Sequence, residues 1–148
     1  MRLDHLNIVV RDLEAAVRFF RHFGYEVGDE AELSGEWLSE VVDLQDVRAR
    51  YTRLESPDSP VLIELITYHQ PQSPKPHGLD QAHWTGYRHI AFRVDDIDAE
   101  VERLSAVGVQ FLSPIDTYPR TGKRIIYGRG PEGILIELAE YFRKAGGV

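Results

Sequence analysis

The pattern of apolar and polar positions occurs twice along the chain. Residues 3–10 (LDHLNIVV) and 87–94 (YRHIAFRV) are both rich in β-forming residues, which predicts a strand in each place. Side chains alternate across a strand, so His5 and Asn7 share one face while the apolar residues between them share the other. The apolar face is the natural partner of a packed helix, and His5 then points to the opposite side.

A helical pattern follows each of these strands. Apolar residues recur at spacings of three and four over residues 13–23, and a second helix is predicted from Asp96 through Val107. Asp12 is suited to cap the first helix, and Gly24 and Gly108 are placed to end the two helices.

The two halves align without a gap over these segments. His5 falls on His89 and Asp12 on Asp96, which indicates an internal repeat. The further predicted strands cover residues 25–27, 47–54, 61–68, 109–112, 124–127 and 134–140. Residues 37–44 fit either a short amphipathic helix or a strand.

The pattern therefore predicts a strand, a helix and three strands in each half, which is an α+β fold of two tandem βαβββ modules. We expect one domain over residues 1–148, with module one at 1–68, a linker or lid at 69–86 and module two at 87–148. The linker assignment rests on its prolines, glycines and histidines, a composition untypical of regular structure.

Composition narrows the classes of partner. The formal charge of −7 argues against nucleic acid and anionic membranes, because both call for clustered Lys and Arg. The absence of cysteine excludes disulfides, thiolate metal sites and a cysteine nucleophile. No apolar run has the length of a signal peptide or a membrane span, so a cytoplasmic protein is the default expectation.

The repeat also places one histidine and one glutamate in each half. Glu64 in VLIEL overlies Glu137 in ILIEL, just as His5 overlies His89. A lone strand histidine is usually a hydrogen-bonded core or edge residue, and a lone glutamate can guard a sheet edge. A carboxylate inside an apolar run, however, costs several kcal/mol unless it is compensated. Because the pattern recurs, we interpret the four residues as ligands of one divalent ion, with Zn, Ni, Co, Mn and Fe all compatible with nitrogen and oxygen donors.

These motifs resemble the vicinal oxygen chelate superfamily, which includes glyoxalase I, bleomycin resistance proteins, methylmalonyl-CoA epimerase and extradiol dioxygenases. The resemblance rests on LDHLNIVV, LIEL, RHIAFRV and GPEGILIEL and covers essentially the whole chain. It implies two βαβββ modules that form a cupped mixed sheet around a central metal.

Ligand identity distinguishes the members of this superfamily. Extradiol dioxygenases use two histidines and one glutamate, and the epimerase carries glutamine where Glu64 stands here. The order His5, Glu64, His89, Glu137 is most similar to glyoxalase I. The resemblance therefore implies a lyase or isomerase that uses one divalent ion per site, with Zn, Ni or Co favoured over Mn or Fe. The alternatives are a methylmalonyl-CoA-epimerase-like enzyme, an Fe(II) extradiol dioxygenase and a small-molecule binding or resistance protein.

Glyoxalase-type chemistry moves a proton next to a metal-bound carbonyl. The resemblance makes Glu137 the first candidate base and Glu64 the second, since the Glu137 position is glutamate in most enzymes of the family. Glu40 and Asp43 are weaker alternative bases. Many members are homodimers, so a homodimer is expected here, with the modules paired either within one chain or between two.

Substrate contacts are predicted from strand parity and local charge. Parity places Asn7 with His5, and Ala91 and Arg93 with His89, on the face of the expected cavity. Arg93 would hold a substrate carboxylate or form a rim salt bridge with Asp95 or Glu100, and Tyr127 would close one wall. Four basic residues around one turn suggest either an anionic substrate tail or a solvated loop: Arg120, Lys123, Arg124 and Arg129. The remaining histidines are assigned to the surface or linker: His22, His69, His77 and His83.

Overall fold

The fold was analysed in a computed structural model, which describes residues 2–74 and 80–141. The chain divides into two compact units, Met1–Lys75 and Pro76–Val148. The predicted linker at 69–86 therefore lies partly outside the described residues, and so does His77. The prediction of a single domain with that linker stays a prediction.

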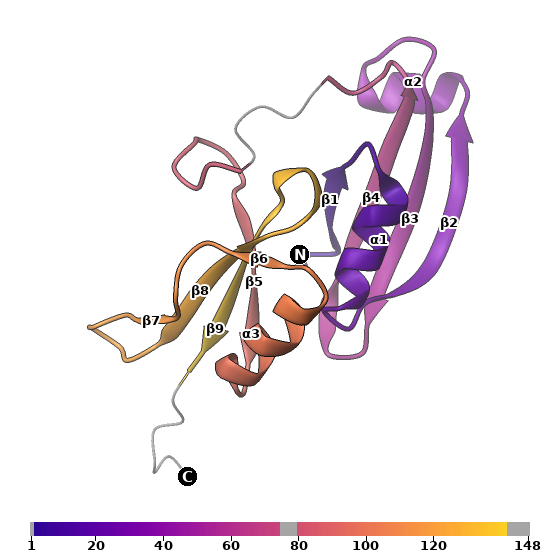
Figure 1. Cartoon of the computed structure of the whole chain (residues 1–148). Helices are drawn as coiled ribbons and strands as arrows, with labels where there is room; N and C mark the ends of the chain where they lie inside the picture. The colour runs from indigo at the N-terminus through magenta and orange to yellow at the C-terminus, as the bar shows by residue number, and fades with distance from the viewer. Residues whose placement is uncertain (1, 75–79, 142–148) are drawn as a thin grey trace. The chain divides into compact units, whose positions relative to one another are not determined.

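Unit 1 is a four-stranded mixed sheet with two helices (Figure 1). Its elements are β1 (His5–Val9), α1 (Leu13–Arg21), β2 (Glu26–Ser34), α2 (Glu36–Val42), β3 (Arg48–Ser56) and β4 (Ser59–Gln70). The strand order is β1-β4-β3-β2, with β1 parallel to β4 and the other neighbours antiparallel. Helix α1 packs on β2, β3 and β4.

Unit 2 repeats this plan. Its elements are β5 (His89–Val94), α3 (Ile97–Ala106), β6 (Gln110–Phe111), β7 (Asp116–Thr117), β8 (Arg124–Arg129), a 3-10 turn (Pro131–Gly133) and β9 (Leu135–Glu140). The strand order is β5-β9-β8-β6, and β7 pairs with β8. Strand β5 is parallel to β9, as β1 is to β4. The predicted α+β fold of two βαβββ modules is confirmed.

The helices begin where their sequence signals predict, and α3 also ends within one residue of its predicted end, but α1 ends at Arg21 and not at Phe23. Asp12 accepts a hydrogen bond from the backbone N–H three residues later at 2.9 Å, and Asp96 does the same at 3.0 Å. These caps satisfy N–H groups that have no partner within the helix. Gly24 and Gly108 follow the two helices at φ angles of +80° and +93°, a region that glycine enters without a Cβ clash.

Strand parity separates a helix-covered face from the opposite face in each unit, here called the open face because neither α1 nor α3 packs on it; in unit 2, β9 is buried on both faces. In β1 and β5 alternate residues are exposed, beginning with the two histidines, and the residues between them are half-buried. The side chains between helix and sheet have almost no exposure: Phe20, Leu54, Ile63 and Leu65 in unit 1, and Ile97, Leu104, Ile136 and Leu138 in unit 2. The histidines therefore point away from α1 and α3, as predicted.

An ion pair between helix and sheet is also duplicated. Glu14 of α1 bonds Arg50 of β3 at 3.3 Å, and Asp98 of α3 bonds Arg124 of β8 at 2.7 Å. The two arginines occupy equivalent positions, each three residues before the residue that pairs with a glutamate of β4 or β9. Arg124 also bonds Glu140 at 3.0 Å, and Glu140 accepts the first N–H of α3 at 3.3 Å.

Two segments differ from the sequence prediction, and a third was left open between helix and strand. Strand β2 continues to Ser34, whereas only residues 25–27 were predicted as strand; β2 is an edge strand with eight of its nine residues exposed, so it shows no apolar period. The ambiguous 37–44 segment is helical, as α2. Strand β7 was not predicted because two residues carry no period. Within the described residues, no helix has the length and apolar character needed to cross a membrane.

Candidate functional site

In unit 1 the parallel pairing of β1 and β4 brings His5 to Glu64. Asn7 is the register partner of Glu64, and His5 lies two residues before Asn7 on the same face. His5 Nε2 is 3.8 Å from Glu64 Oε1. The other ring nitrogen, Nδ1, is 2.8 Å from the Asp4 carboxylate. A carboxylate only accepts, so Nδ1–H is the donor and Nε2 of the neutral ring keeps its lone pair.

The Glu64 carboxylate is held by an amide. Asn7 Nδ2 donates to Glu64 Oε1 at 3.0 Å, and it lies 3.5 Å from the Glu64 backbone oxygen. The Glu64 side chain is 25% exposed. Asn7, predicted as a substrate contact, is thus a neighbour that orients Glu64. This leaves the negative charge of Glu64 without a Lys or Arg partner among the described contacts.

In unit 2 the same register brings His89 to Glu137. Ala91 pairs with Glu137, and His89 Nε2 is 3.4 Å from Glu137 Oε2. Tyr127 of β8 is the antiparallel partner of Glu137, and its ring meets the His89 ring edge-on at 5.0 Å between centroids. The Glu137 side chain is only 8% exposed. Tyr127 therefore lies beside this pair, and its predicted role as one wall of a substrate cavity stays a prediction.

The buried Glu137 carboxylate has a cationic partner. Lys123 Nζ donates to Glu137 Oε1 at 2.9 Å, and the Lys123 side chain is 21% exposed. The hydrogen bond to Glu137 raises the pKa of Lys123 despite partial burial. Burial, and next a hydrogen bond to Glu137, raise the pKa of Tyr127. Both neighbours thus keep their protons next to this carboxylate.

Two of these partners were missed or misplaced by sequence reasoning. Asp4 directly precedes His5, so a search for a carboxylate beside each histidine would have found it. Lys123 was grouped with a basic turn. It precedes β8 by one residue and has the same parity as Tyr127, so extending the strand backwards would have placed it on the Glu137 face.

The four basic residues of that turn bind different partners, and Lys123 binds Glu137. Arg124 lies on the helix-covered side, bound to Asp98 and Glu140. Arg129 donates to the Asp80 backbone oxygen, and Arg120 donates to the Tyr118 hydroxyl. They do not form one anion-binding surface, and we do not retain Arg120 or Arg124 as substrate contacts.

Arg93 lies on the open face with His89, as parity predicts. No ion pair joins it to Asp95 or Glu100 in the described part of the chain; Glu100 bonds Arg103 instead, at 2.6 Å. The guanidinium of Arg93 lies 5.5 Å from the centroid of the Tyr141 ring.

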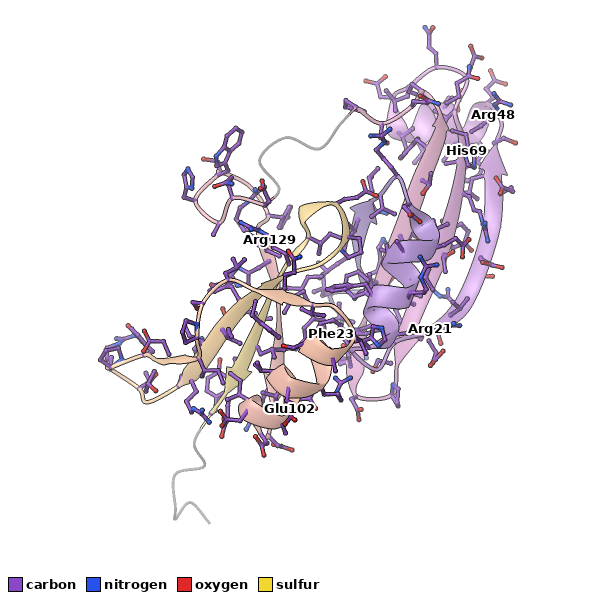
Figure 2. All side chains as sticks on the ribbon, in the orientation of Figure 1. Arg21, Phe23, Arg48, His69, Glu102 and Arg129 are labelled. Carbon is purple, nitrogen blue, oxygen red and sulfur yellow. The ribbon has the colours of Figure 1, made fainter. Side chains whose placement is uncertain are left out.

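The alternative bases Glu40 and Asp43 lie elsewhere in unit 1. They line an open hollow beside α2 together with Arg48 and Gln70. Gln70 is six residues beyond Glu64 on β4, which is roughly 20 Å along a strand. Figure 2 shows Arg48 and His69 at this α2 end of the sheet.

The histidines assigned to the surface or linker have separate surroundings. His69 of β4 is 3.6 Å from Glu32 of the edge strand β2, which lies beyond β3 in the sheet. His22 caps the end of α1, and His83 is exposed. The His69–Glu32 pair differs from the pairs of His5 and His89 in exposure, because its side chains are 50% and 70% exposed, and it has no equivalent in the repeat.

The repeat, the fold and the paired histidines all point to one family, and sequence comparison agrees. The profile of the Glyoxalase/Bleomycin resistance protein/Dioxygenase superfamily matches residues 2–138. The chain belongs to this superfamily. The superfamily includes many enzymes, and its members bind small molecules.

Individual relatives in the superfamily cover most of the chain. A glyoxalase family protein from Bacillus cereus, solved by crystallography, is 33% identical with a TM-score of 0.87, covering 97% of this chain and 95% of that one. The Bacillus subtilis protein named "Uncharacterized protein YwkD" is 28% identical over 93% of this chain and 95% of its own length. "Glyoxalase I" of Saccharomyces cerevisiae is 30% identical over 96% of this chain and 45% of its own length.

A divalent ion is typical of the superfamily, and the donor atoms of each pair fit one. Two ligand atoms held at about 2.1 Å by a tetrahedral ion lie about 3.4 Å apart. The His89–Glu137 and His5–Glu64 separations are 3.4 and 3.8 Å. No cluster of three or more potential ligands occurs among the described residues, so each unit offers a pair and not a complete site.

Proposed function

We propose that this protein is a divalent-metal-dependent lyase or isomerase of glyoxalase type, acting on a small anionic substrate that carries a carbonyl group. The observation that carries the proposal is the duplicated pair, in which a histidine Nε2 lies 3.8 Å from a glutamate in unit 1 and 3.4 Å in unit 2. The similarity to "Glyoxalase I" of Saccharomyces cerevisiae supports the same reaction class.

The proposed ligands are His5, Glu64, His89 and Glu137, which present two imidazole nitrogens and two carboxylates. This donor set suits Zn, Ni or Co, and also accepts Mn or Fe. When bound, the ion polarises a substrate carbonyl and makes the adjacent C–H more acidic. Asp4 holds the His5 ring by its Nδ1–H, as a carboxylate often does for a ligating histidine.

Glu64 is the better placed proton acceptor of the two glutamates. Lys123 already donates a hydrogen bond to Glu137, so its ammonium must move away from this carboxylate, or share it with the substrate proton, before Glu137 can act as a base. Glu64 is more exposed and its side-chain partners are the Asn7 amide and His5. This reverses the sequence-based preference for Glu137, and it assigns Glu137 to holding the ion.

Metal content tests the proposal directly. The purified protein is loaded with Zn, Ni or Co, freed of excess ion and analysed by mass spectrometry, beside the variants His5→Ala, Glu64→Gln, His89→Ala and Glu137→Gln. One ion per site is expected for the native chain and a large loss in every variant. Glu102→Ala, on the exposed side of α3, is the matched control and should load fully. A native chain that binds no ion overturns the proposal.

Proton transfer is tested by exchange of carbon-bound hydrogen in D2O. The loaded protein is given the hemithioacetal of methylglyoxal with a small thiol or with glutathione, and methylmalonyl-CoA in a parallel arm. Proton exchange or product formation is expected to require the ion and Glu64. Oxygen consumption with a catechol would instead assign the protein to ring cleavage and refute the proposed reaction.

In the homodimer expected from the superfamily, the ligands of one site come from one chain or from two, and a mixing experiment distinguishes these cases. Glu64→Gln and Glu137→Gln chains are unfolded together and refolded as a mixture. If both pairs of one site come from one chain, the mixture binds no more ion than either variant alone. If the pairs come from two chains, mixed dimers regain intact sites and ion binding rises.

One observation favours a second function, a metal-independent small-molecule binding protein. The Lys123 ammonium already compensates the buried Glu137 carboxylate, so unit 2 does not require an ion for charge balance. In this case the chelator-treated protein would bind its ligand without turnover, and the four ligand substitutions would leave binding unchanged.

A further inference from the structure

Three side chains of unit 2 gather where the ends of three strands meet. Arg93 lies near the end of β5, Tyr141 directly follows β9 and Lys123 directly precedes the antiparallel β8. Arg93 Cζ and Lys123 Nζ lie 5.5 and 5.7 Å from the centroid of the same Tyr141 ring. One aromatic ring thus brings two cationic groups to the open face that carries Glu137.

The two cations have different partners. Lys123 uses one of its three N–H donors on Glu137, which leaves two for another acceptor. Arg93 is exposed, and no carboxylate bonds it among the described residues. Within residues 2–74 and 80–141, the two positive charges therefore share one acidic partner, and no carboxylate occupies the N–H donors of the guanidinium.

We propose that Arg93 and Lys123, held on Tyr141, form a subsite that binds the carboxylate of a small organic acid next to Glu137. The planar guanidinium matches a carboxylate with two parallel N–H donors, and the ammonium adds a third from the side. The subsite narrows the substrate class of the proposed function to carboxylic acids and rests on that function only for its place in catalysis.

Anion binding is measured on the full-length, chelator-treated protein by NMR titration, so that it does not depend on turnover. The probe is pyruvate, a small carboxylate with an adjacent carbonyl, and pyruvamide is its neutral counterpart. We expect pyruvate to bind with a dissociation constant of about 1 mM, on the scale expected for so few atoms, and pyruvamide at least about tenfold more weakly. Equal binding of the two overturns the proposal.

Arg93→Met removes the guanidinium and should weaken pyruvate binding about tenfold or more. Arg120→Met is the matched control, because Arg120 also lies on a tyrosine, with its Cζ 5.7 Å from the Tyr118 ring centroid, but away from Glu137. Arg120→Met should bind like the native protein. Equal loss in both variants, or none in Arg93→Met, contradicts the subsite.

Lys123 is tested without leaving a buried carboxylate unpaired. Glu137→Gln releases the ammonium and removes a like charge next to the ligand, so pyruvate should bind severalfold more tightly. Adding Lys123→Met to Glu137→Gln should then weaken binding about tenfold relative to Glu137→Gln alone. A double variant that binds like Glu137→Gln excludes Lys123.

Inorganic phosphate is the competing oxyanion. Phosphate that binds through Arg93 at least about tenfold more tightly than pyruvate overturns the assignment to a carboxylate. The two proposals fail in different ways. Loss of the metal centre leaves Arg93-dependent pyruvate binding intact, whereas failure of the subsite leaves the metal content of the native chain unchanged.

Discussion

The two units have the same strand and helix arrangement. They differ in how the charge of the glutamate at the equivalent position, Glu64 or Glu137, is compensated. Both carry a capped helix, a helix–sheet ion pair and a parallel strand pair that sets a histidine beside a glutamate. In unit 1 a neutral amide, Asn7, bonds Glu64. In unit 2 an ammonium, Lys123, bonds the more buried Glu137.

This difference separates the parts of the repeat that build the fold from the parts that set its chemistry. The ion pairs Glu14–Arg50 and Asp98–Arg124 occur at equivalent positions, on the helix-covered side. The neighbours of the two glutamates differ on the open side. We infer that Glu64 remains available for a proton and an ion, while Glu137 is held in place before any ion binds.

The largest expected effect comes from removing the ammonium of unit 2. Lys123→Met leaves the buried Glu137 carboxylate without its cationic partner and should lower the free energy of unfolding by about 3 kcal/mol, measured by urea denaturation in chelator. Lys123→Met with Glu137→Gln should recover most of this loss. Added Zn should stabilise Lys123→Met more than the native chain, because the ion replaces the missing positive charge. Equal stability of the native chain and Lys123→Met in chelator would contradict our account of unit 2.

A smaller effect is expected at the support of His5. Asp4→Ala removes the acceptor of Nδ1–H, so the ring loses its fixed orientation and metal affinity should fall about 10- to 100-fold. The measurement is competition with a metal chelator, with Glu102→Ala as the control. An unchanged affinity would show that Asp4 does not orient a ligand.

Asn7→Ala should be milder than Lys123→Met, because it removes a neutral donor from a partly exposed carboxylate. We expect a loss of about 1 kcal/mol in the free energy of unfolding. Asn7→Ala and Lys123→Met are measured under the same conditions, so that the losses in the free energy of unfolding can be compared between the two units. A loss as large as that of Lys123→Met would show that burial does not distinguish the two glutamates.

The smallest effect concerns the duplicated ion pair. Arg124 lowers the pKa of Asp98 below its usual value of about 3.9. This contribution to stability is present above the pKa of the unfolded chain and disappears as pH falls through the lower pKa of the folded protein. Asp98→Asn should therefore lower Tm slightly at pH 7, and the difference from the native chain should close in acid. A difference that widens in acid would refute the assigned direction.

Much of the fold was predictable because it depends on the apolar periodicity of the sequence and on its internal repeat. Alternation in residues 3–10 and 87–94 correctly predicted which face the histidines occupy, and Asp12 correctly predicted the start of α1, whereas α1 ends two residues before the predicted end at Phe23. Strand β2 was shortened in the prediction because an edge strand exposed on both faces needs no apolar residues. Apolar periodicity arises from the burial of one face, so it does not indicate a strand that is exposed on both faces.

The contacts of individual side chains were less predictable. The roles of Lys123 and Arg124 depend on which face each occupies at the start of β8, and adjacent residues there point in opposite directions. One residue thus reaches Glu137 while the next anchors α3. A cluster of charges in the sequence cannot distinguish the two until strand parity is known.

The ammonium on Glu137 also has a consequence for the order of assembly. The carboxylate is neutralised by the chain itself as β8 and β9 pair, so unit 2 can reach its fold before any ion arrives from the cell. Under the proposed function, a shortage of metal would then leave a folded protein that can be loaded later. Loading would be a reversible exchange of the Lys123 ammonium for the ion on an already folded unit.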